Sequence, residues 1–558
     1  MAKPAHISME AAQMAPAQNP YPKGMVAAAN PHAVEAGVEI LRKGGTAVDA
    51  AIAVQSTLGL VEPQSSGIGG GAFMVYYDAK TGKVTAYNGR ETAPSAIDEN
   101  LFMNPDGMPM RFLDRVLSGK STGVPGAIAM LHMAHEDHGK LPWADGFDYA
   151  IQLAEKGFII SPRLASLIPV GGERGLKRQK AARAYFFHED GTPYKAGEVR
   201  DNKPYAKTLK AIAKNWRALY EGPIAKHIIA DIHANPTPGL LSLADMKAYR
   251  AQKQEALCSA YRDYILCGAQ PPSSGGVAVQ SIMGQLQNFD MARLGQSVQG
   301  WHVFAETSAL AYADRDRYVA DPDFVKVPTR ALLDPDYLKS RAALIKMDRA
   351  LENVEAGDPV HFKPGKDATP EKKNTSHFVI VDRWGNVVSM TTTVESLFGS
   401  ERMVDGFFLN NQLTDFSFLP RDEAGNPVAN RPGPSKRPRS SMAPHIVFHK
   451  DGSFAFATGS PGGSSIIAYT AKTIIGLIDW GLSPQEAIDL PNFISRNGAI
   501  RLEESRFDPE IATGLEALGH KVIREKGEIS GLHIIRRKPD GSYDGGADPR
   551  REGRVESE

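Results

Sequence analysis

The pair Asn374-Thr375 constrains the fold of this chain more than any other sequence feature. Asn374 can end a cleaved segment, and Thr375 starts a predicted buried strand. After them come an apolar run, a turn at residues 384–386 and a threonine-rich return strand that ends at Thr393. A threonine hydroxyl is a poor nucleophile near neutral pH unless a base takes its proton. As the first residue of a chain, Thr375 would have that base in its own α-amine, whose typical pKa is roughly 7.7–8.0. The segment therefore predicts self-cleavage between Asn374 and Thr375.

The overall composition is that of an ordinary globular protein, and it excludes several classes of partner. The chain has 558 residues, 42% of them hydrophobic, which suits one large α/β domain or several smaller ones. Its 64 Lys and Arg residues balance 64 Asp and Glu residues, so no overall charge attracts nucleic acid or an anionic membrane. The most basic stretch, residues 174–217, lacks a recognition motif and is interpreted as a solvated surface. No apolar run approaches the roughly 20 residues of a membrane span. We expect neither nucleic acid nor a membrane as a partner.

The cysteines and the first residues carry three further expectations. Cys258 and Cys267 lie in one apparent strand–turn–strand, which excludes a disulfide framework. We expect two free thiols, with a single cross-strand bridge as the alternative. No Cys/His cluster has metal-ligand spacing, so we expect neither a metal nor another cofactor. Residues 1–24 form a polar extension without an apolar core. This predicts no signal peptide and a cytoplasmic protein, or a periplasmic or secreted one if a leader was removed.

Hydrophobic periodicity divides the chain into a mainly helical part and a strand-rich part. Asn30 and Pro31 begin a predicted helix over residues 31–42, and Thr46 caps a second helix that continues to Leu60. Further helices are predicted within residues 126–253, 280–318, 464–480 and 484–489, and strands at residues 72–77, 83–87, 377–381, 387–393, 407–409, 446–448 and 454–458. Residues 361–374 read as an exposed loop, where a cleavage site would be accessible. The pattern predicts an α+β fold of two packed sheets covered by helices.

Two glycine-containing segments imitate phosphate-binding loops without meeting their requirements. Residues 65–71 lie between a helix and a strand, the reverse of the order that a dinucleotide loop needs, so tight backbone packing explains them better. Residues 118–121 imitate the end of a Walker loop, but Asp114 stands where the first glycine is required. Neither segment predicts nucleotide binding.

Four other segments become coherent when they are taken together with the Thr375 strand. Arg90 ends a predicted strand, and residues 408–416 place several polar side chains directly after another. Residues 436–444 hold a serine pair in a loop bounded by prolines. Residues 458–464 form a glycine-containing turn that opens a helix, where backbone N–H groups suit a developing oxyanion. Together these segments resemble the gamma-glutamyltransferase family of N-terminal-nucleophile hydrolases, and the resemblance covers nearly the whole chain.

This resemblance implies a four-layer αββα sandwich made by one self-cleaved precursor. After the extension, residues 25–374 would form a mostly helical large subunit and residues 375–558 a strand-rich small subunit. The two would stay together as a heterodimer, with further dimerisation left open. Thr375 would attack the substrate amide, Thr393 would support its hydroxyl, and the N–H groups of Gly462 and Gly463 would stabilise the oxyanion.

The family's usual substrate is a γ-glutamyl amide, so the resemblance also implies binding sites for an ammonium and a carboxylate. Arg90, Ser440 and Ser441 match the carboxylate-binding residues, and Gln412 and Asp415 match residues that bind the ammonium. Glu395 is a departure, because many members carry Asn there. It would accept from the ammonium, or it would pair with an arginine such as Arg402 and leave the pocket unable to recognise glutamate. The lid segment, residues 418–435, contains no Tyr and is short, which favours hydrolysis over transpeptidation.

The sequence therefore predicts a self-cleaving γ-glutamyl hydrolase and transferase that acts on glutathione and related small γ-glutamyl amides through a Thr375-linked acyl-enzyme. One alternative is an amidase for another carboxylated acyl amide, such as a glutaryl-β-lactam side chain. A second alternative is an uncleaved, non-catalytic binding protein. The intact set of Thr375, Thr393, Gly462 and Gly463 argues against this second alternative.

Overall fold

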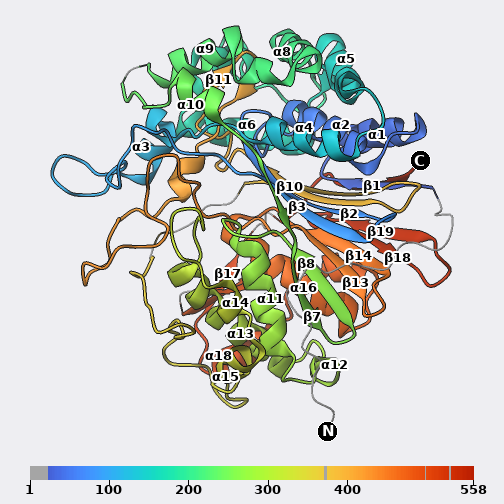
Figure 1. The fold of residues 1–558 in the computed structure, drawn as a ribbon, viewed down its shortest axis with the longest axis vertical. Helices are drawn as coiled ribbons and strands as arrows, with labels where there is room; N and C mark the ends of the chain where they lie inside the picture. The colour runs from blue at the N-terminus through green and yellow to red at the C-terminus, as the bar shows by residue number, and fades with distance from the viewer. Residues whose placement is uncertain (1–22, 235, 368, 370–373, 497, 527–529) are drawn as a thin grey trace.

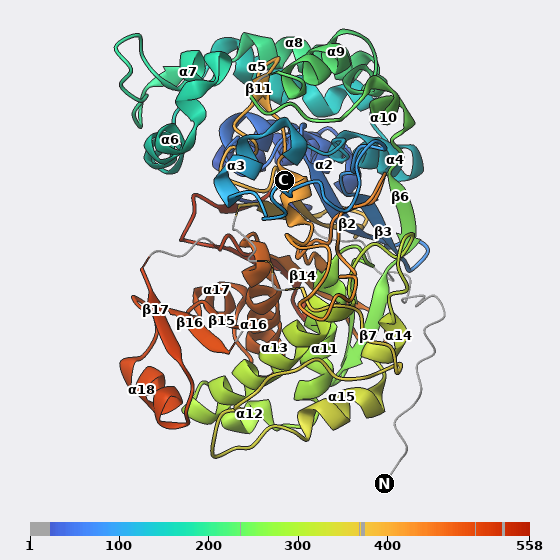
Figure 2. The ribbon, with the colours of Figure 1, turned by 90° about the vertical axis from the view of Figure 1, so that its left-hand side faces the viewer.

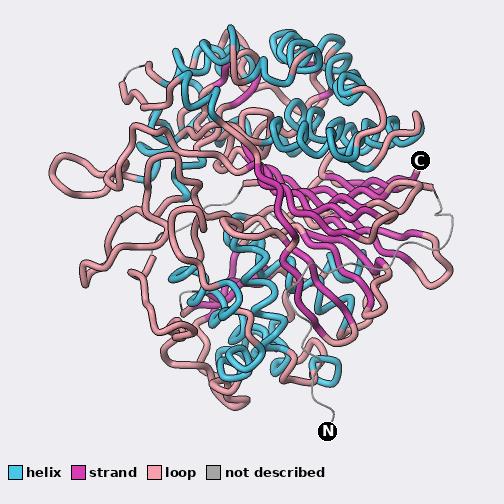
Figure 3. Tube along the Cα trace, viewed as in Figure 1, coloured by secondary structure: helices cyan, strands magenta, loops and turns pink. Residues whose placement is uncertain are grey.

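The computed structural model describes residues 23–558 except 235, 368, 370–373, 497 and 527–529. Two large antiparallel sheets lie at its centre (Figures 1 and 3). The seven-stranded sheet has the order β20 (Arg554–Ser557), β1 (Met25–Ala28), β9 (Ser376–Val381), β10 (Val387–Thr393), β2 (Gly71–Asp78), β3 (Lys83–Gly89) and β6 (Gln252–Glu255). The six-stranded sheet has the order β19 (Tyr543–Ala547), β18 (His533–Arg537), β14 (Phe454–Gly459), β13 (His445–His449), β8 (Tyr264–Gly268) and β7 (Leu257–Tyr261).

Helices cover the outer face of each sheet, so the molecule has four layers (Figures 1 and 2). Over the seven-stranded sheet lie α1 (Pro31–Arg42), α2 (Ala47–Val61), α4 (Ala127–His138), α5 (Asp148–Lys156), α6 (Pro162–Arg174), α8 (Lys203–Lys214), α9 (Gly222–Ile232) and α10 (Leu243–Ala248). Over the six-stranded sheet lie α11 (Ser274–Leu286), α13 (Val298–Tyr318), α15 (Pro335–Ala342), α16 (Ile466–Ile478) and α17 (Pro484–Asp489). Beside them, α18 (Pro509–Ala517) joins β16 (Ala499–Glu503) to β17 (Val522–Glu525), and β15 (Phe493–Arg496) completes that small sheet.

The β9 strand shows why the two sheets pack face to face. Its side chains alternate between two hydrophobic cores, because successive residues of a strand point to opposite faces. Phe378 and Ile380 belong to the core under α1 and α2. Val379 and Val381 belong to the other core, which lies between the two sheets and continues to α11. A strand that is apolar on both faces needs a covering layer on each side. The predicted α+β, four-layer αββα sandwich is therefore confirmed.

Local sequence signals explain the first two helices. The Asn30 side chain accepts from the backbone N–H of His32, and Pro31 occupies the first turn of α1. Thr46 and Asp49 form a reciprocal capping box at the start of α2. The glycine run that follows α2 serves close packing, as predicted. A Cβ on Gly70 would lie 2.0 Å from the carbonyl oxygen of Thr393.

The loop before Thr375 is less exposed than the sequence predicted. His361, Phe362 and Lys363 are exposed, but Pro364, Gly365, Asp367 and Thr369 are buried. The burial arises because this segment packs on the 418–435 lid, where the Gly365 N–H donates to the Pro427 carbonyl at 3.0 Å. The rest of the predicted loop, residues 368 and 370–373, lies outside the described residues. In the described ranges no helix is both long and apolar enough to cross a bilayer.

The prediction of two free thiols is wrong, because Cys258 and Cys267 form a disulfide. The antiparallel pairing of β7 with β8 places these two residues directly opposite each other, a register that composition alone does not reveal. We expect no thiol to react with an alkylating reagent in the unfolded, unreduced protein and two to react after reduction. Because the bridge closes a short loop, reduction should lower the free energy of unfolding by about 2–3 kcal/mol. Two reactive thiols without reductant would contradict this pairing.

Candidate active site

Thr375 lies immediately before β9, and Thr393 ends the neighbouring strand β10. The antiparallel register, with Ser376 opposite Thr392, brings the two threonine hydroxyls to 3.4 Å from each other. Both hydroxyls reach the carbonyl oxygen of Asn374: Thr375 donates to it directly, and Thr393 Oγ1 donates to it at 2.8 Å. The carbonyl of the predicted scissile bond is therefore held beside the predicted nucleophile.

Arg551, near the end of the chain, holds the backbone of Thr375. Arg551 is buried, and its Nη1 donates to the Thr375 carbonyl at 2.7 Å while its Nε donates to the Ser530 carbonyl at 3.0 Å. The carboxylate of Glu62 lies 3.7 Å from the Arg551 guanidinium. Burial lowers the pKa of Arg551 to about 9. This contact with Thr375 was not predicted from the sequence.

A small cavity lies at Thr375 and contains most of the predicted site. Its volume is about 30 Å³, which is room for little more than a water molecule. The predicted residues on its wall are Asn374, Thr375, Thr393, Glu395, Gln412, Asp415, Ser440, Ser441 and Gly463, and the wall also includes Arg439, Met442 and Ile466. Arg90 and Gly462 are not on the wall. Because Asn374 itself borders the space, the uncleaved chain has no room for an acyl substrate.

One side of the cavity is acidic. Asn411 Nδ2 donates to the Glu395 carboxylate, and Gln412 Nε2 donates to Asp415 Oδ2 at 2.9 Å. Burial, and then the charge of Asp415, raise the pKa of Glu395 to about 7. The alternative pairing of Glu395 with Arg402 is wrong, because the Arg402 guanidinium instead binds Asp231 at 3.0 Å.

Arg90 lies beneath the cavity and not on its wall. Its side chain is fully buried, its Nε donates to the Pro438 carbonyl at 3.0 Å, and its Nη2 donates to the Arg439 carbonyl at 2.7 Å. The same Nη2 donates to Asp415 Oδ2 at 2.5 Å. Arg90 therefore fixes Asp415 and the backbone of the serine loop. Its predicted contact with a substrate carboxylate stays a prediction.

The cavity wall also carries the serine pair, which lies beside cations that the sequence did not single out. Ser441 Oγ accepts from Arg315 Nη2 at 2.5 Å, and Ser440 Oγ accepts from the Met442 N–H at 3.2 Å. Arg439 follows Pro438 in the same loop and pairs with Asp367 at 2.9 Å. The position of Arg439 next to Ser440 was visible in the sequence, but its place on the cavity wall was not.

The two glycines of the predicted oxyanion site adopt backbone conformations that other residues disfavour. Gly462 has φ of 137° and Gly463 has φ of 58°. Gly463 lies on the cavity wall at the turn that leads into α16. Gly462 stands one residue outside the wall. Their role as oxyanion donors stays a prediction.

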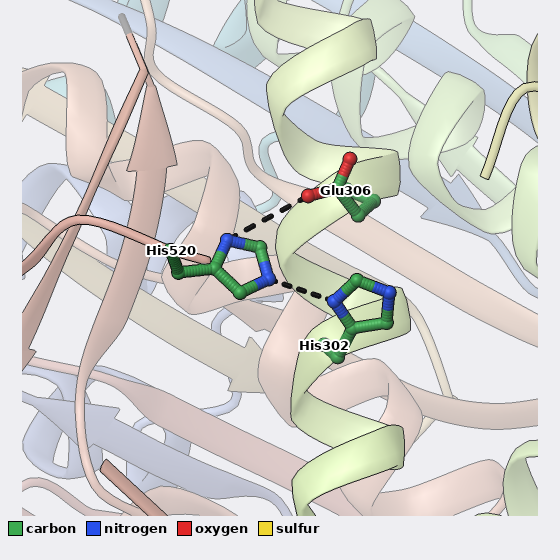
Figure 4. A group of neighbouring side chains, drawn as sticks. All are labelled: His302, Glu306 and His520. Atoms are coloured by element: carbon green, nitrogen blue, oxygen red, sulfur yellow. Dashed lines mark hydrogen bonds and ion pairs between the residues drawn. The ribbon is translucent and has the colours of Figure 1, made fainter. Parts of the chain in front are cut away.

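A second group of polar side chains, away from the cavity, joins α13 to the residues after α18 (Figure 4). His302, Glu306 and His520 bring possible metal-ligand atoms within 4.8 Å of one another, although the sequence spacing had suggested no such group. His302 Nε2 lies 2.6 Å from the Lys346 carbonyl, so it must donate, and His302 Nδ1 then accepts from His520 Nε2 at 2.7 Å. The two imidazoles already form a hydrogen bond with each other. This group is therefore a hydrogen-bonded link between α13 and His520.

Comparison with known proteins agrees with this fold. The sequence profile of the gamma-glutamyltranspeptidase family matches residues 33–557. The glutathione hydrolase proenzyme of Bacillus subtilis (strain 168) is 37% identical over 543 residues, which cover 95% of this chain and 90% of that protein. The Acylase ACY 1 proenzyme of Pseudomonas sp. (strain V22) is 34% identical over 534 residues, with 94% and 92% covered. The crystal structure of cephalosporin acylase from Bacillus halodurans has a TM-score of 0.84 at 27% identity and covers 99% of both chains.

The four-layer sandwich, with a threonine at the start of a central strand, defines an N-terminal-nucleophile hydrolase. The chain belongs to the gamma-glutamyltranspeptidase family, and it is an enzyme of that family.

Proposed function

We propose that the protein cleaves itself before Thr375 and then hydrolyses small γ-glutamyl amides, including glutathione, through a Thr375-linked acyl-enzyme. The observation that carries this proposal is the contact of both threonine hydroxyls with the Asn374 carbonyl. Relatives named glutathione hydrolase proenzymes support it. Cleavage would yield a large subunit ending at Asn374 and a small subunit beginning at Thr375, which remain packed through the shared seven-stranded sheet.

The positions of these groups support a self-cleavage reaction. Thr375 Oγ1 attacks the Asn374 carbonyl carbon, and the Thr393 hydroxyl donates to the oxygen as it becomes negative. The C–N bond then breaks, the nitrogen takes the proton that the Thr375 hydroxyl gives up, and an ester joins Asn374 to Thr375 Oγ1. Water hydrolyses this ester and leaves the Asn374 carboxylate, the Thr375 hydroxyl and a free α-amine.

The mature reaction uses the same hydroxyl with the new amine as its base. Thr375 attacks the γ-carbonyl of the donor, the amine leaves with a proton, and water resolves the acyl-enzyme. Glu395, Gln412 and Asp415 form the acidic wall that would hold the donor ammonium. Ser440 and Ser441 also lie on the cavity wall, and the donor carboxylate would lie beside them. We further propose that hydrolysis exceeds transpeptidation, because the lid of residues 418–435 offers no tyrosine to order an acceptor.

A second candidate is an acylase for a carboxylated acyl group without an ammonium, since a relative 34% identical is named Acylase ACY 1. Three p-nitroanilides separate the candidates. The γ-glutamyl donor has both charges, the glutaryl donor lacks the ammonium, and the 4-aminobutyryl donor lacks the carboxylate. Preference for the γ-glutamyl donor over the glutaryl donor supports the first candidate. A cleaved enzyme that prefers the glutaryl donor would establish the second candidate, and inactivity on all three would exclude both.

Glu395 should give the γ-glutamyl reaction a pH dependence that the glutaryl reaction lacks. Its pKa is raised to about 7, so below pH 7 the group is protonated and cannot attract an ammonium. Between pH 6 and pH 8 the ionised fraction rises about tenfold. We expect the ratio of kcat/KM in wild type to that in Glu395→Gln to rise by about that factor with the γ-glutamyl donor. The Thr375 α-amine titrates in both proteins and cancels in the ratio. A ratio that stays flat would mean that Glu395 does not bind the ammonium.

A further inference from the structure

Three largely buried side chains with metal-ligand atoms meet between α13 and the turn after α18 (Figure 4). His302 and Glu306 stand four positions apart on α13, so they project from the same face of this helix. His520 faces both of them: its Nε2 lies 2.7 Å from His302 Nδ1, and its Nδ1 lies 3.6 Å from Glu306 Oε1. Two imidazoles and one carboxylate are a ligand set that suits Zn²⁺.

The backbone around His520 is fixed by the end of α18. The His520 N–H donates to the Leu515 carbonyl at 3.1 Å, as in a Schellman motif, and Gly519 before it has φ of 93°. The Ala350 N–H donates to the Leu518 carbonyl at 2.7 Å, which ties the segment after α15 to the same helix end. The fold therefore holds His520 and this segment together independently of any ligand.

Both side chains on α13 have hydrogen bonds that orient them. His302 Nε2 donates to the Lys346 carbonyl at 2.6 Å, so the lone pair of its Nδ1 faces His520. The Leu351 N–H donates to Glu306 Oε2 at 3.3 Å, and Oε1 is the oxygen that faces His520. Metal-binding histidines almost always donate their second N–H to a carbonyl or carboxylate in this way. The supporting contacts of a metal site are thus already present.

The carboxylate of Glu306 lacks a strong positive partner. Among the described residues its ion-pair partner is His520, and no lysine or arginine takes this role. An imidazole with a single N–H is uncharged, and His520 already gives that N–H to His302. A buried carboxylate without a positive partner is unfavourable. A divalent cation would supply the missing charge.

We propose that Zn²⁺, or another divalent first-row transition metal, binds between His302 Nδ1, His520 Nε2 and a carboxylate oxygen of Glu306. The metal takes the place of the Nε2 proton of His520, and this proton moves to Nδ1 of the same ring. Two nitrogen ligands of a tetrahedral Zn²⁺ stand roughly 3.3 Å apart, so the imidazoles separate by about 0.6 Å. Rotation of the His520 side chain can supply this shift. A water molecule would be the fourth ligand.

The position of this site indicates a structural role. His302, Glu306 and His520 are not on the wall of the Thr375 cavity. If the chain is cut before Thr375, the first two residues belong to the large subunit and His520 belongs to the small one. The metal would then join the two subunits, a consequence that rests on the proposed function, whereas metal binding itself does not. The sequence predicted no metal because it was searched for local spacing, and His302 and His520 are 218 positions apart.

Zinc titration of purified wild type tests the site. The protein is treated with EDTA, freed from it by gel filtration, and titrated with Zn²⁺ in competition with a chromogenic zinc indicator. We expect one Zn²⁺ per chain or per pair of cleaved chains, and a Tm that rises by about 2–3 °C at a free zinc concentration about 100 times Kd. Co²⁺ should bind in its place with the intense visible absorption of a four-coordinate ion. Wild type that binds no zinc, or that shows only the pale spectrum of six-coordinate Co²⁺, would contradict the proposal.

Glu306→Gln and His520→Gln test the individual ligands. Both keep a polar side chain of similar size, and each should lower the affinity for Zn²⁺ by at least about 100-fold and abolish the rise in Tm. His233→Gln is the matched control, because His233 Nε2 also lies near a backbone carbonyl, that of Leu241, at 2.8 Å, but His233 is not a member of this group. It should bind zinc as wild type does. Unchanged affinity in both ligand variants would place the zinc elsewhere and refute the assignment. If either variant fails to fold, the Co²⁺ spectrum of wild type decides.

Separation of the cleaved chains in urea tests the bridging role. EDTA should lower the urea concentration at which the two chains of wild type separate on gel filtration, and it should have no such effect on Glu306→Gln. An equal effect on both proteins would contradict the bridge. Wild type that binds zinc but stays uncut would refute the proposed function and not the site. Cleaved, active wild type that binds no zinc would refute the site alone.

Discussion

Replacement of Thr375 by alanine should leave the chain in one piece and without activity. The variant lacks the hydroxyl that donates to the Asn374 carbonyl, and it cannot form the acyl-enzyme. We expect a single full-length band on a denaturing gel where wild type gives two unequal bands. Turnover of γ-glutamyl-p-nitroanilide should fall by at least about 10⁴-fold, as when a catalytic nucleophile is removed from other hydrolases.

Thr375→Ser is the control for this variant, because it keeps a hydroxyl and an α-amine at the same position. It should still produce two bands, more slowly than wild type, and it should retain measurable turnover. Two bands from Thr375→Ala with the wild-type masses would show that another group performs the cleavage.

Replacement of Thr393 by valine should slow self-cleavage by about 10²- to 10³-fold. Valine has nearly the same shape, but it removes the hydroxyl that donates to the Asn374 carbonyl oxygen at 2.8 Å. Loss of one donor to a developing oxyanion typically has this effect on rate. The measurement is the half-time for conversion of freshly made precursor into the two bands.

Thr392→Val is the matched control for Thr393→Val. Thr392 precedes Thr393 in β10, but its hydroxyl lies 3.4 Å from the Gly71 carbonyl and makes no contact with Asn374. It should cleave at close to the wild-type rate. If both variants cleave equally fast, the Thr393 hydroxyl has no part in the reaction.

Features of the fold that depend on a local sequence pattern were predicted correctly. The capped helix α1, the two strands β9 and β10 and the helix α17 follow from caps, period-two apolar runs and turn residues. The predicted site residues lie together because most of them stand at the ends of strands in one region of the sandwich. Thr375 and Thr393 are neighbours because Thr375 directly precedes β9 and Thr393 ends β10, the antiparallel partner of β9.

Features that depend on distant partners could not be predicted. Arg439 binds Asp367 across 72 positions of sequence, and no pattern near either residue indicates this pair. The disulfide depends on the register of β7 and β8, and the burial of Pro364 and Gly365 depends on the lid. His520 joins His302 across 218 positions. In each case, packing of separate elements decides which polar groups meet.

The masses of the chains in purified, active wild-type protein test self-cleavage at Thr375 most directly. We expect one chain that ends with Asn374 and another that begins with Thr375 and has a free α-amine. Activity from an unbroken chain, or a new N-terminus at any other residue, would contradict the assignment of Thr375 as both nucleophile and base.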